Sequence, residues 1–166
     1  LAACIVTPFV GGVLCSSIVK RNMEWAQGLK RSSMTPPAWV FRPMWTILYV
    51  LLGVASHMVI KEADQQDLRL LLAVYGVNLL LNWLWTPVFF KLHRLKTASS
   101  SISFSFSAAI IFVTMLSAVG CCALFHKVNP TAGLLLLPYV IWLILACVFS
   151  VRTAALNPCL LPKEAP

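Results

Sequence analysis

The sequence is poor in charged residues. Only 11% of its 166 residues are Asp, Glu, Lys or Arg, whereas a typical soluble domain carries about 25%. Hydrophobic residues make up 60% of the chain. Because so little polar surface cannot cover a water-soluble fold of this size, we expect an integral membrane protein in contact with the lipid bilayer.

Acidic residues are especially scarce, with five Asp and Glu against 13 Lys and Arg. All five acids lie in predicted loops or the tail, so no paired carboxylates occur within a span for proton coupling. The sequence also lacks a glycine-rich phosphate-binding loop and a Ser, His and Asp set suited to hydrolysis. We therefore predict no catalytic residues, and an enzyme is the less favoured class of protein.

The six cysteines lack the spacing of a metal site or a secreted disulfide framework. No CxxC pair is matched by a His partner, and all cysteines except Cys159 lie inside apolar runs. We interpret them as small buried hydrophobic residues. The sequence accordingly predicts no metal site and no cofactor.

The first apolar run lacks the features of a secretory signal peptide. It has no basic start, and Lys20 and Arg21 follow it in place of a small-residue cleavage site. We therefore expect a retained membrane span at this position.

Apolar runs long enough to cross the hydrocarbon occur five times along the chain. The sequence therefore predicts an all-α membrane protein, a five transmembrane helix bundle that forms a single domain over 1–166. The predicted spans are 1–19, 39–60, 68–90, 98–125 and 131–156.

The fourth run contains a segment with the period of a strand. Ser101 to Ser107 alternates Ser with Ile or Phe, but a lone strand cannot satisfy its backbone in lipid, so a helix is predicted. In a helix, Ser99, Ser103 and Ser107 share one face of small side chains. Such a face packs closely against a neighbouring helix of the same chain or of a second copy in a homodimer.

Basic residues divide unequally between the two ends of the predicted spans. The poorer end has Lys61, Arg69 and Lys127. The richer end has ten, namely Lys20, Arg21, Lys30, Arg31, Arg42, Lys91, Arg94, Lys96, Arg152 and Lys163. The positive-inside rule then predicts that the first loop, the third loop and the C-terminus face the cytosol. Basic residues in such loops contact anionic headgroups, so the net charge of +8 does not indicate nucleic acid.

Aromatic and amide residues recur at helical spacing inside three spans. Trp45 and Tyr49 are one turn apart in the second, and Trp142 and Ala146 are one turn apart in the last. In the third span Asn78, Asn82 and Trp85 share a face, placed at i, i+4 and i+7. The amides either bond to neighbouring helices or present polar groups to a ligand, two alternatives that the sequence leaves open.

A site lined by Trp, Tyr, Leu and a few amides suits a flat, largely apolar ligand. Such a ligand gains from burial and ring stacking, while a few polar groups fix its orientation. Pro87 adds a further feature, because it leaves a backbone carbonyl one turn earlier without its helical donor. We expect either that the helix kinks at this point or that the carbonyl accepts a hydrogen bond from a side chain or water.

These residues resemble the translocator protein family, also called the peripheral benzodiazepine receptor or tryptophan-rich sensory protein family. The resemblance covers nearly the whole chain and rests on the order and spacing of several motifs. They are Trp25, Gly28-Leu29, PPAWVF at Pro36 to Phe41, PMWTILY at Pro43 to Tyr49, GVAS at Gly53 to Ser56, YGVNLLLNWLWTPVFF at Tyr75 to Phe90, and LLPYVIW at Leu136 to Trp142.

The resemblance implies a five-helix bundle whose first loop covers a ligand pocket open to the cytosolic side. It implies porphyrin or haem as ligands, cholesterol in many animal members, and the mitochondrial outer membrane for eukaryotic members. Trp39, taken alone, is typical of an anchor at the headgroups. The residues that match the family's pocket are Trp39, Trp45, Asn82, Trp83, Trp85, Trp142 and Ala146, to which we add Tyr49 and Asn78 as candidate ligand-binding residues.

The chain departs from the family's proposed sterol motif, because Val151 stands where that motif has Tyr. The resemblance implies three alternative functions, of which intact Trp45 and Trp142 favour the first two over the third, while the sequence does not separate the first from the second. The first is binding and transport of tetrapyrroles or sterols, the second is light-dependent breakdown of a bound porphyrin, and the third is a membrane scaffold with a vestigial pocket.

Overall fold

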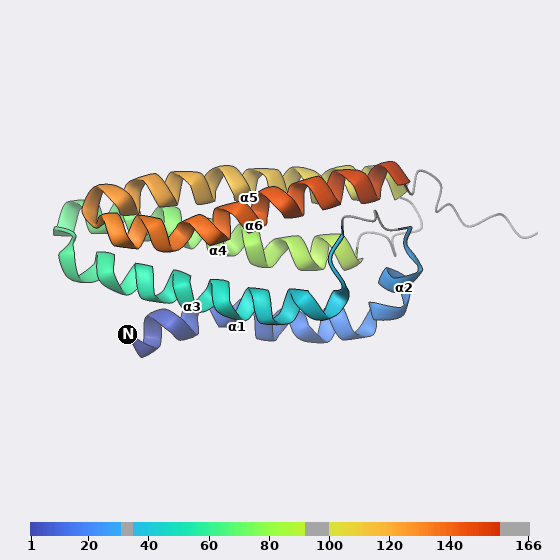
Figure 1. Ribbon diagram of the computed structural model, residues 1–166, viewed down its shortest axis with the longest axis horizontal. Coiled ribbons are helices and arrows are strands. Elements are labelled where there is room, and N and C mark those ends of the chain that lie inside the picture. The colour runs from blue at the N-terminus through green and yellow to red at the C-terminus, as the bar shows by residue number, and fades with distance from the viewer. Residues whose placement is uncertain (31–34, 92–99, 157–166) are drawn as a thin grey trace, which may run out of the picture.

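The computed structural model describes residues 1–30, 35–91 and 100–156, and these residues form an elongated bundle of helices (Figure 1). Five long helices are each apolar enough to cross a membrane. They are α1 (Ala2–Arg21), α3 (Ala38–Glu62), α4 (Gln65–Lys91), α5 (Ser100–Val128) and α6 (Pro130–Leu156). A short helix, α2 (Met23–Gly28), follows α1.

The five-span prediction is confirmed: each long helix begins and ends within a few residues of the bounds predicted for its span. The alternating serine segment is helical, since α5 begins at Ser100. Ser107 is buried within the chain itself, whereas Ser99 and the side chain of Ser103 lie outside the described part. The sequence did not predict α2, which occupies part of the first loop.

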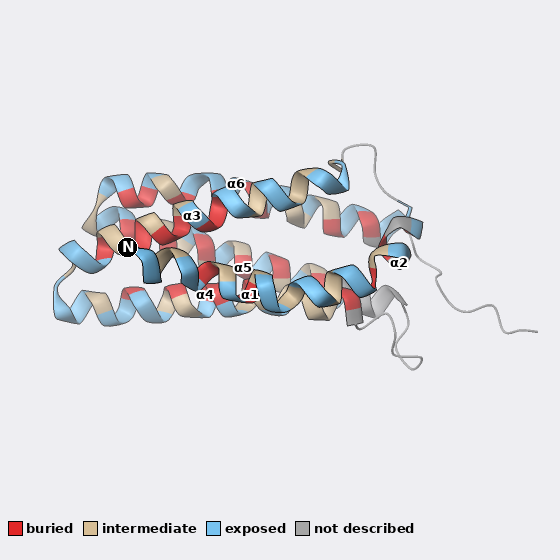
Figure 2. Ribbon diagram, turned by 90° about the horizontal axis from the view of Figure 1, so that it is seen from below, coloured by how far each residue is buried: buried red, intermediate tan, exposed pale blue. Residues whose placement is uncertain are grey.

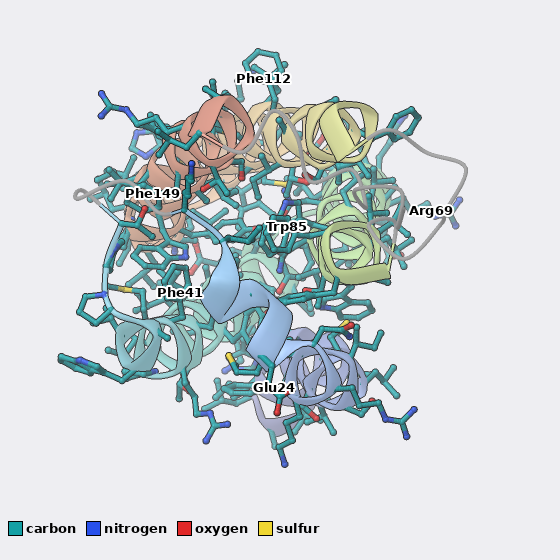
Figure 3. The ribbon with its side chains drawn as sticks, turned by 90° about the vertical axis from the view of Figure 1, so that its right-hand side faces the viewer. Glu24, Phe41, Arg69, Trp85, Phe112 and Phe149 are labelled. Atoms are coloured by element: carbon teal, nitrogen blue, oxygen red, sulfur yellow. The ribbon has the colours of Figure 1, made fainter. Side chains whose placement is uncertain are left out.

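The long helices are arranged as a ring in the order α1, α3, α6, α5, α4, with α4 returning to α1. Figure 3 shows this ring from the end that carries α2. Each long helix has a neighbour on either side in this ring, and α3 and α5 also contact each other across it. Each helix therefore turns one side to the ring interior and another to the surroundings. The core of buried residues comes from α3, α4, α5 and α6.

Glycine lets α1 close the ring between α3 and α4. A Cβ built on Gly53 of α3 would lie 2.5 Å from the Cα of Ile5, so the backbones of α1 and α3 meet at this point. A Cβ on Gly11 of α1 would lie 2.1 Å from the indole of Trp83 on α4. Apart from these contacts α1 is mostly exposed, as Figure 2 shows.

Polar contacts hold together the end of the bundle opposite α2. The Nδ2 of Asn129 donates to both carboxylate oxygens of Glu62, at 2.8 Å each, which joins the end of α3 to the α5–α6 turn. The Oδ1 of Asn129 accepts from the backbone N–H of Ala132 at 2.9 Å. Asp64 caps α4 by accepting from the backbone N–H groups of Gln66 and Asp67.

The two ends of the bundle differ in charge as the sequence predicts. The end with α2 also holds the start of α3 and the last turns of α4 and α6 (Figure 1), and therefore Lys20, Lys30, Arg42 and Arg152. Lys61, Arg69 and Lys127 lie toward the other end. The loop from Arg94 to Lys96 lies outside the described residues.

We expect the α2 end to face the cytosol, because basic loops are retained on that side. The measurement is labelling of a single cysteine placed at Thr97, in a variant without other cysteines, by a thiol reagent that cannot cross the membrane. Reagent added on the cytosolic side should label it in intact vesicles or organelles. Labelling only from the opposite side would reverse the orientation.

Candidate functional site

Aromatic side chains meet in the middle of the ring. The ring centroid of Trp45 lies 5.3 Å from that of Tyr49, one turn along α3, and 6.3 Å from that of Tyr139 on α6. Phe9 of α1 packs edge-on against Tyr49 at 5.4 Å. Three helices thus contribute rings to one interior cluster, as the spacing of Trp45 and Tyr49 suggested.

A second group of rings lies nearer the α2 end. Phe41 contacts Trp142 edge-on at 5.5 Å between α3 and α6, and Trp85 stacks on Phe89 of α4 at 5.0 Å with an angle of 18°. Figure 3 shows Trp85 near the centre of the ring, with Phe41 also directed inward. Ala146, one turn after Trp142, is half-buried and packs against the core.

Asn78 connects three helices at the depth of the core. Its Nδ2 donates to the carbonyl of Thr114 at 3.0 Å and to the hydroxyl of Ser117 at 2.8 Å, both on α5. Its Oδ1 accepts from the hydroxyl of Tyr139 on α6 at 3.0 Å. The residue is 1% exposed. Of the two alternatives for this amide, the structure shows the bond between helices.

Asn82 makes the corresponding link between α4 and α3. Its Nδ2 donates to the hydroxyl of Tyr49 at 3.1 Å. Both Asn side chains are therefore engaged in helix packing, and each fixes a tyrosine of the aromatic cluster. A buried amide or hydroxyl left without its partner costs about 1–3 kcal/mol, which is why these bonds hold the rings in place.

Trp83 faces α1 and not the aromatic cluster. Its indole lies against the backbone of Gly11, and its Nε1 donates to the carbonyl of Pro8 at 3.3 Å. The sequence grouped Trp83 with the candidate ligand-binding residues. The structure instead uses its ring to pack α4 against α1.

The carbonyl that Pro87 leaves free is that of Trp83, four residues earlier. The thiol of Cys15 on α1 donates to it at 3.5 Å. Of the alternatives open in the sequence, a side chain from a neighbouring helix satisfies this carbonyl. The bond joins α1 to α4 at a residue two positions before Trp85.

Trp39 lies apart from the other candidates, in the first turn of α3 and 75% exposed. That position suits an anchor at the headgroups. The structure therefore brings together Trp45, Tyr49, Asn78, Asn82, Trp85, Trp142 and Ala146 in the ring interior, places Trp83 against α1, and leaves Trp39 on the surface.

Several site residues escaped the sequence analysis. Phe41 lies one turn before Trp45, so the spacing of Phe41, Trp45 and Tyr49 was a signal that could have identified it. Phe89 lies four residues after Trp85, and Tyr139 lies three residues before Trp142, so the same helical spacing could have identified both. Among the described residues, no three His, Cys, Asp or Glu side chains gather in a way that would hold a metal ion.

Burial is uneven along the interior. The large side chains that are less than 2% exposed include Leu52, Phe125 and Leu136, and they belong to the middle of the bundle and the end opposite α2. The inward rings nearer α2, including Phe41, Trp45 and Trp85, pack on this core but are only partly buried. Aromatic surface is thus left accessible at the α2 end.

These features define a multi-pass helical membrane protein with an aromatic and amide cluster inside a ring of five spans. The model of the TspO/MBR family matches residues 4–156. This chain belongs to the TspO/MBR family.

Relatives from bacteria and mammals support the assignment. Protein CrtK of Rhodobacter capsulatus is 35% identical over 135 residues, which cover 81% of this chain and 79% of CrtK. The tryptophan-rich sensory protein of Cereibacter sphaeroides is 32% identical, with 95% and 88% of the two chains covered. The translocator protein of Sus scrofa is 30% identical, with 87% and 82% covered.

Proposed function

We propose that this chain binds tetrapyrroles, such as porphyrin and haem, among the interior rings at its α2 end and takes part in their transport or homeostasis. The observation that carries the proposal is the partly buried aromatic surface of Phe41, Trp45 and Trp85 beside a fully packed core. A flat macrocycle gains from stacking on such rings. The relatives' names, translocator protein and tryptophan-rich sensory protein, agree with a role in moving or sensing a membrane-borne ligand.

The test is titration of the purified chain, in lipid nanodiscs, with protoporphyrin. Binding should quench tryptophan fluorescence, and the porphyrin should stay with the protein through gel filtration. Empty nanodiscs correct for partition of the porphyrin into lipid. If the porphyrin stays with the lipid and does not bind the protein, the result would favour the third alternative, a membrane scaffold with a vestigial pocket. A spectrum that changes only in the bound fraction under light would favour porphyrin breakdown over transport.

Mitochondrial outer membrane is the location we propose if the chain comes from a eukaryote. Relatives of the chain occur in bacteria, an archaeon and mammals. Fractionation of cells that express the tagged chain tests this location.

Because Val151 stands where the family's sterol motif has Tyr, we expect any sterol contact to be weaker than in members with that motif, or to depend on another helix surface, such as the face of Ser99, Ser103 and Ser107. Val151 is 59% exposed on α6, and Arg152 beside it is also exposed. Valine can pack on a sterol, but it has no hydroxyl to bond the sterol head. We expect Val151→Tyr to raise photo-crosslinking of a sterol probe at α6. Equal crosslinking at matched expression would show that this position does not control sterol contact.

A further inference from the structure

Helix α1 closes a gap that the other long helices leave open. Within the described part of the chain, α3 and α4 do not pack along each other, and α1 lies between them. Tyr49 of α3 lies behind α1: Phe9 packs edge-on against its ring, and a Cβ built on Gly12 would lie 3.2 Å from its Cε2. Tyr49 in turn contacts Trp45. At this point α1 therefore separates the aromatic cluster from the bilayer.

The bilayer opposes outward movement of α1 weakly. Most of α1 already faces the surroundings, and its buried residues are Pro8 and Gly11. Lipid is as apolar as the helix surfaces that would separate, so packing and hydrogen bonds, and not a hydrophobic driving force, hold a transmembrane helix in its place. The attachment of α1 thus depends on individual contacts, and these differ along its length.

Before Pro8, α1 is held by its backbone. A Cβ built on Gly53 would lie 2.5 Å from the Cα of Ile5 and 2.8 Å from the carbonyl oxygen of Cys4, so the backbones of α1 and α3 touch. Pro8 has no N–H to donate to the carbonyl of Cys4, four residues earlier. Because a helix kinks most readily where such a bond is missing, Pro8 marks the turn at which α1 bends.

After Pro8, α1 is held by side chains. The indole of Trp83 lies against Gly11, and its Nε1 donates to the carbonyl of Pro8 at 3.3 Å. This distance exceeds the usual range of about 2.7–3.2 Å. The thiol of Cys15 donates to the carbonyl of Trp83 at 3.5 Å, and a thiol is a weak donor. The part of α1 that covers Tyr49 therefore has the weaker attachment.

The α2 end offers an apolar ligand a less direct path. Figure 3 shows α2 in front of the helix ring, between α1 and the centre, and Ala26 and Leu29 are each 8% exposed. A flat, apolar molecule gains free energy by partition into the bilayer. A path through the α2 end would require it to leave the lipid before it reaches the rings, whereas a path past α1 would not.

We infer that the part of α1 from Phe9 to Arg21 is a movable side wall, and that ligand passes between the bilayer and the ring interior beside Tyr49 when this wall swings outward at Pro8. The ligand is a flat, largely apolar molecule dissolved in the membrane. The route rests on the proposed function, whereas the movement of the wall is a property of the chain without ligand.

The first measurement needs no ligand and compares two half-buried thiols. Cys15 donates to α4 from α1, and Cys122 of α5 donates to the carbonyl of Gly133 on α6 at 3.3 Å. Cys15 lies six residues before the end of its helix at Arg21, and Cys122 lies six residues before the end of its helix at Val128. The two thiols therefore match in chemistry and in distance from a helix end.

Single-cysteine variants in phosphatidylcholine nanodiscs are treated with N-ethylmaleimide, which enters the bilayer. Cys15 should be alkylated at least about tenfold faster than Cys122, because α1 opens locally and the α5–α6 pair does not. The same two variants in denaturant should react at equal rates, which controls for intrinsic reactivity.

The second measurement is the rate of protoporphyrin exchange, followed by stopped-flow fluorescence quenching. Cys15→Ala removes a donor that holds the wall and should raise the association and dissociation rate constants together by about two- to tenfold, the effect of one hydrogen bond. The Kd should stay unchanged, since Cys15 lies outside the aromatic cluster. Cys122→Ala removes the corresponding thiol bond between α5 and α6 and should change neither rate constant.

Equal alkylation of Cys15 and Cys122 would overturn the movable wall. Faster alkylation of Cys15 combined with unchanged porphyrin rates in Cys15→Ala would overturn the route and place ligand entry at the α2 end. If the parent does not bind protoporphyrin, the proposed function and the route fail together, and alkylation alone decides whether α1 moves. Gel filtration and thermal unfolding confirm that each variant is folded before it is measured.

Discussion

Trp142→Ala is expected to weaken protoporphyrin binding at least about three- to tenfold, the range that follows from loss of one aromatic contact. Trp142 is 6% exposed and packs edge-on against Phe41, so its truncation removes a ring from the α3–α6 side of the site. Trp45→Ala should act similarly, because Trp45 contacts both Tyr49 and Tyr139. Fluorescence quenching in nanodiscs gives the affinities.

Phe112→Ala is the matched control for these two variants. Phe112 is 51% exposed on α5 and points away from the bundle in Figure 3, so its loss should leave porphyrin affinity unchanged. If both tryptophan variants bind porphyrin as tightly as the Phe112 variant, the rings serve helix packing and not the ligand.

Gly53→Ala is expected to destabilise the bundle by about 1–3 kcal/mol, the usual cost of forcing extra volume into a packed contact. The new Cβ would lie 2.5 Å from the Cα of Ile5 and 2.8 Å from the carbonyl oxygen of Cys4. Both are backbone atoms, so no side-chain rotation relieves the overlap. Helix α1 must move away from α3, which thermal unfolding followed by circular dichroism will detect.

Gly76→Ala and Gly120→Ala separate this contact from the general effect of glycine in a helix. A Cβ at either position would meet nothing within 4 Å. Alanine favours a helix by about 1 kcal/mol relative to glycine, so both controls should be neutral or more stable than the parent. A Gly53→Ala protein as stable as these controls would show that α1 does not approach α3 as closely as the structure has it.

Gly11→Ala should also destabilise the bundle. Its Cβ would overlap Cγ, Cδ1 and Cδ2 of Trp83, the indole atoms nearest the backbone, so the whole ring must leave its site and lose its hydrogen bond to Pro8. The expected loss of stability in thermal unfolding is therefore at least comparable to that of Gly53→Ala.

The sequence was sufficient to locate the five spans, because runs of about 20 apolar residues have few other uses in a protein. Asn78 and Asn82 also stood out, since amides at that depth rarely face lipid. The residues to which these two amides hydrogen-bond could not be identified from the sequence. Which side of an apolar helix turns inward is poorly encoded in hydropathy, because interior and lipid are both apolar surroundings.

Trp83 and Trp85 illustrate that limit. They are two residues apart and therefore point in different directions from α4, but both lie in one apolar motif. Only the ring order of the helices shows that Trp83 faces α1 and Trp85 faces the interior. Gly11 likewise gave no signal by itself, because its role depends on a tryptophan that lies far along the chain.

The hydrogen bond from Cys15 to the carbonyl of Trp83 offers a direct spectroscopic view of the bundle. The S–H stretch absorbs in a part of the infrared spectrum where other protein groups are silent, and it moves to lower frequency when the thiol donates. The Cys15 band is identified as the one missing from Cys15→Ala. Its frequency then reports whether α1 is docked on α4, in intact membranes and without any label, as ligand is added.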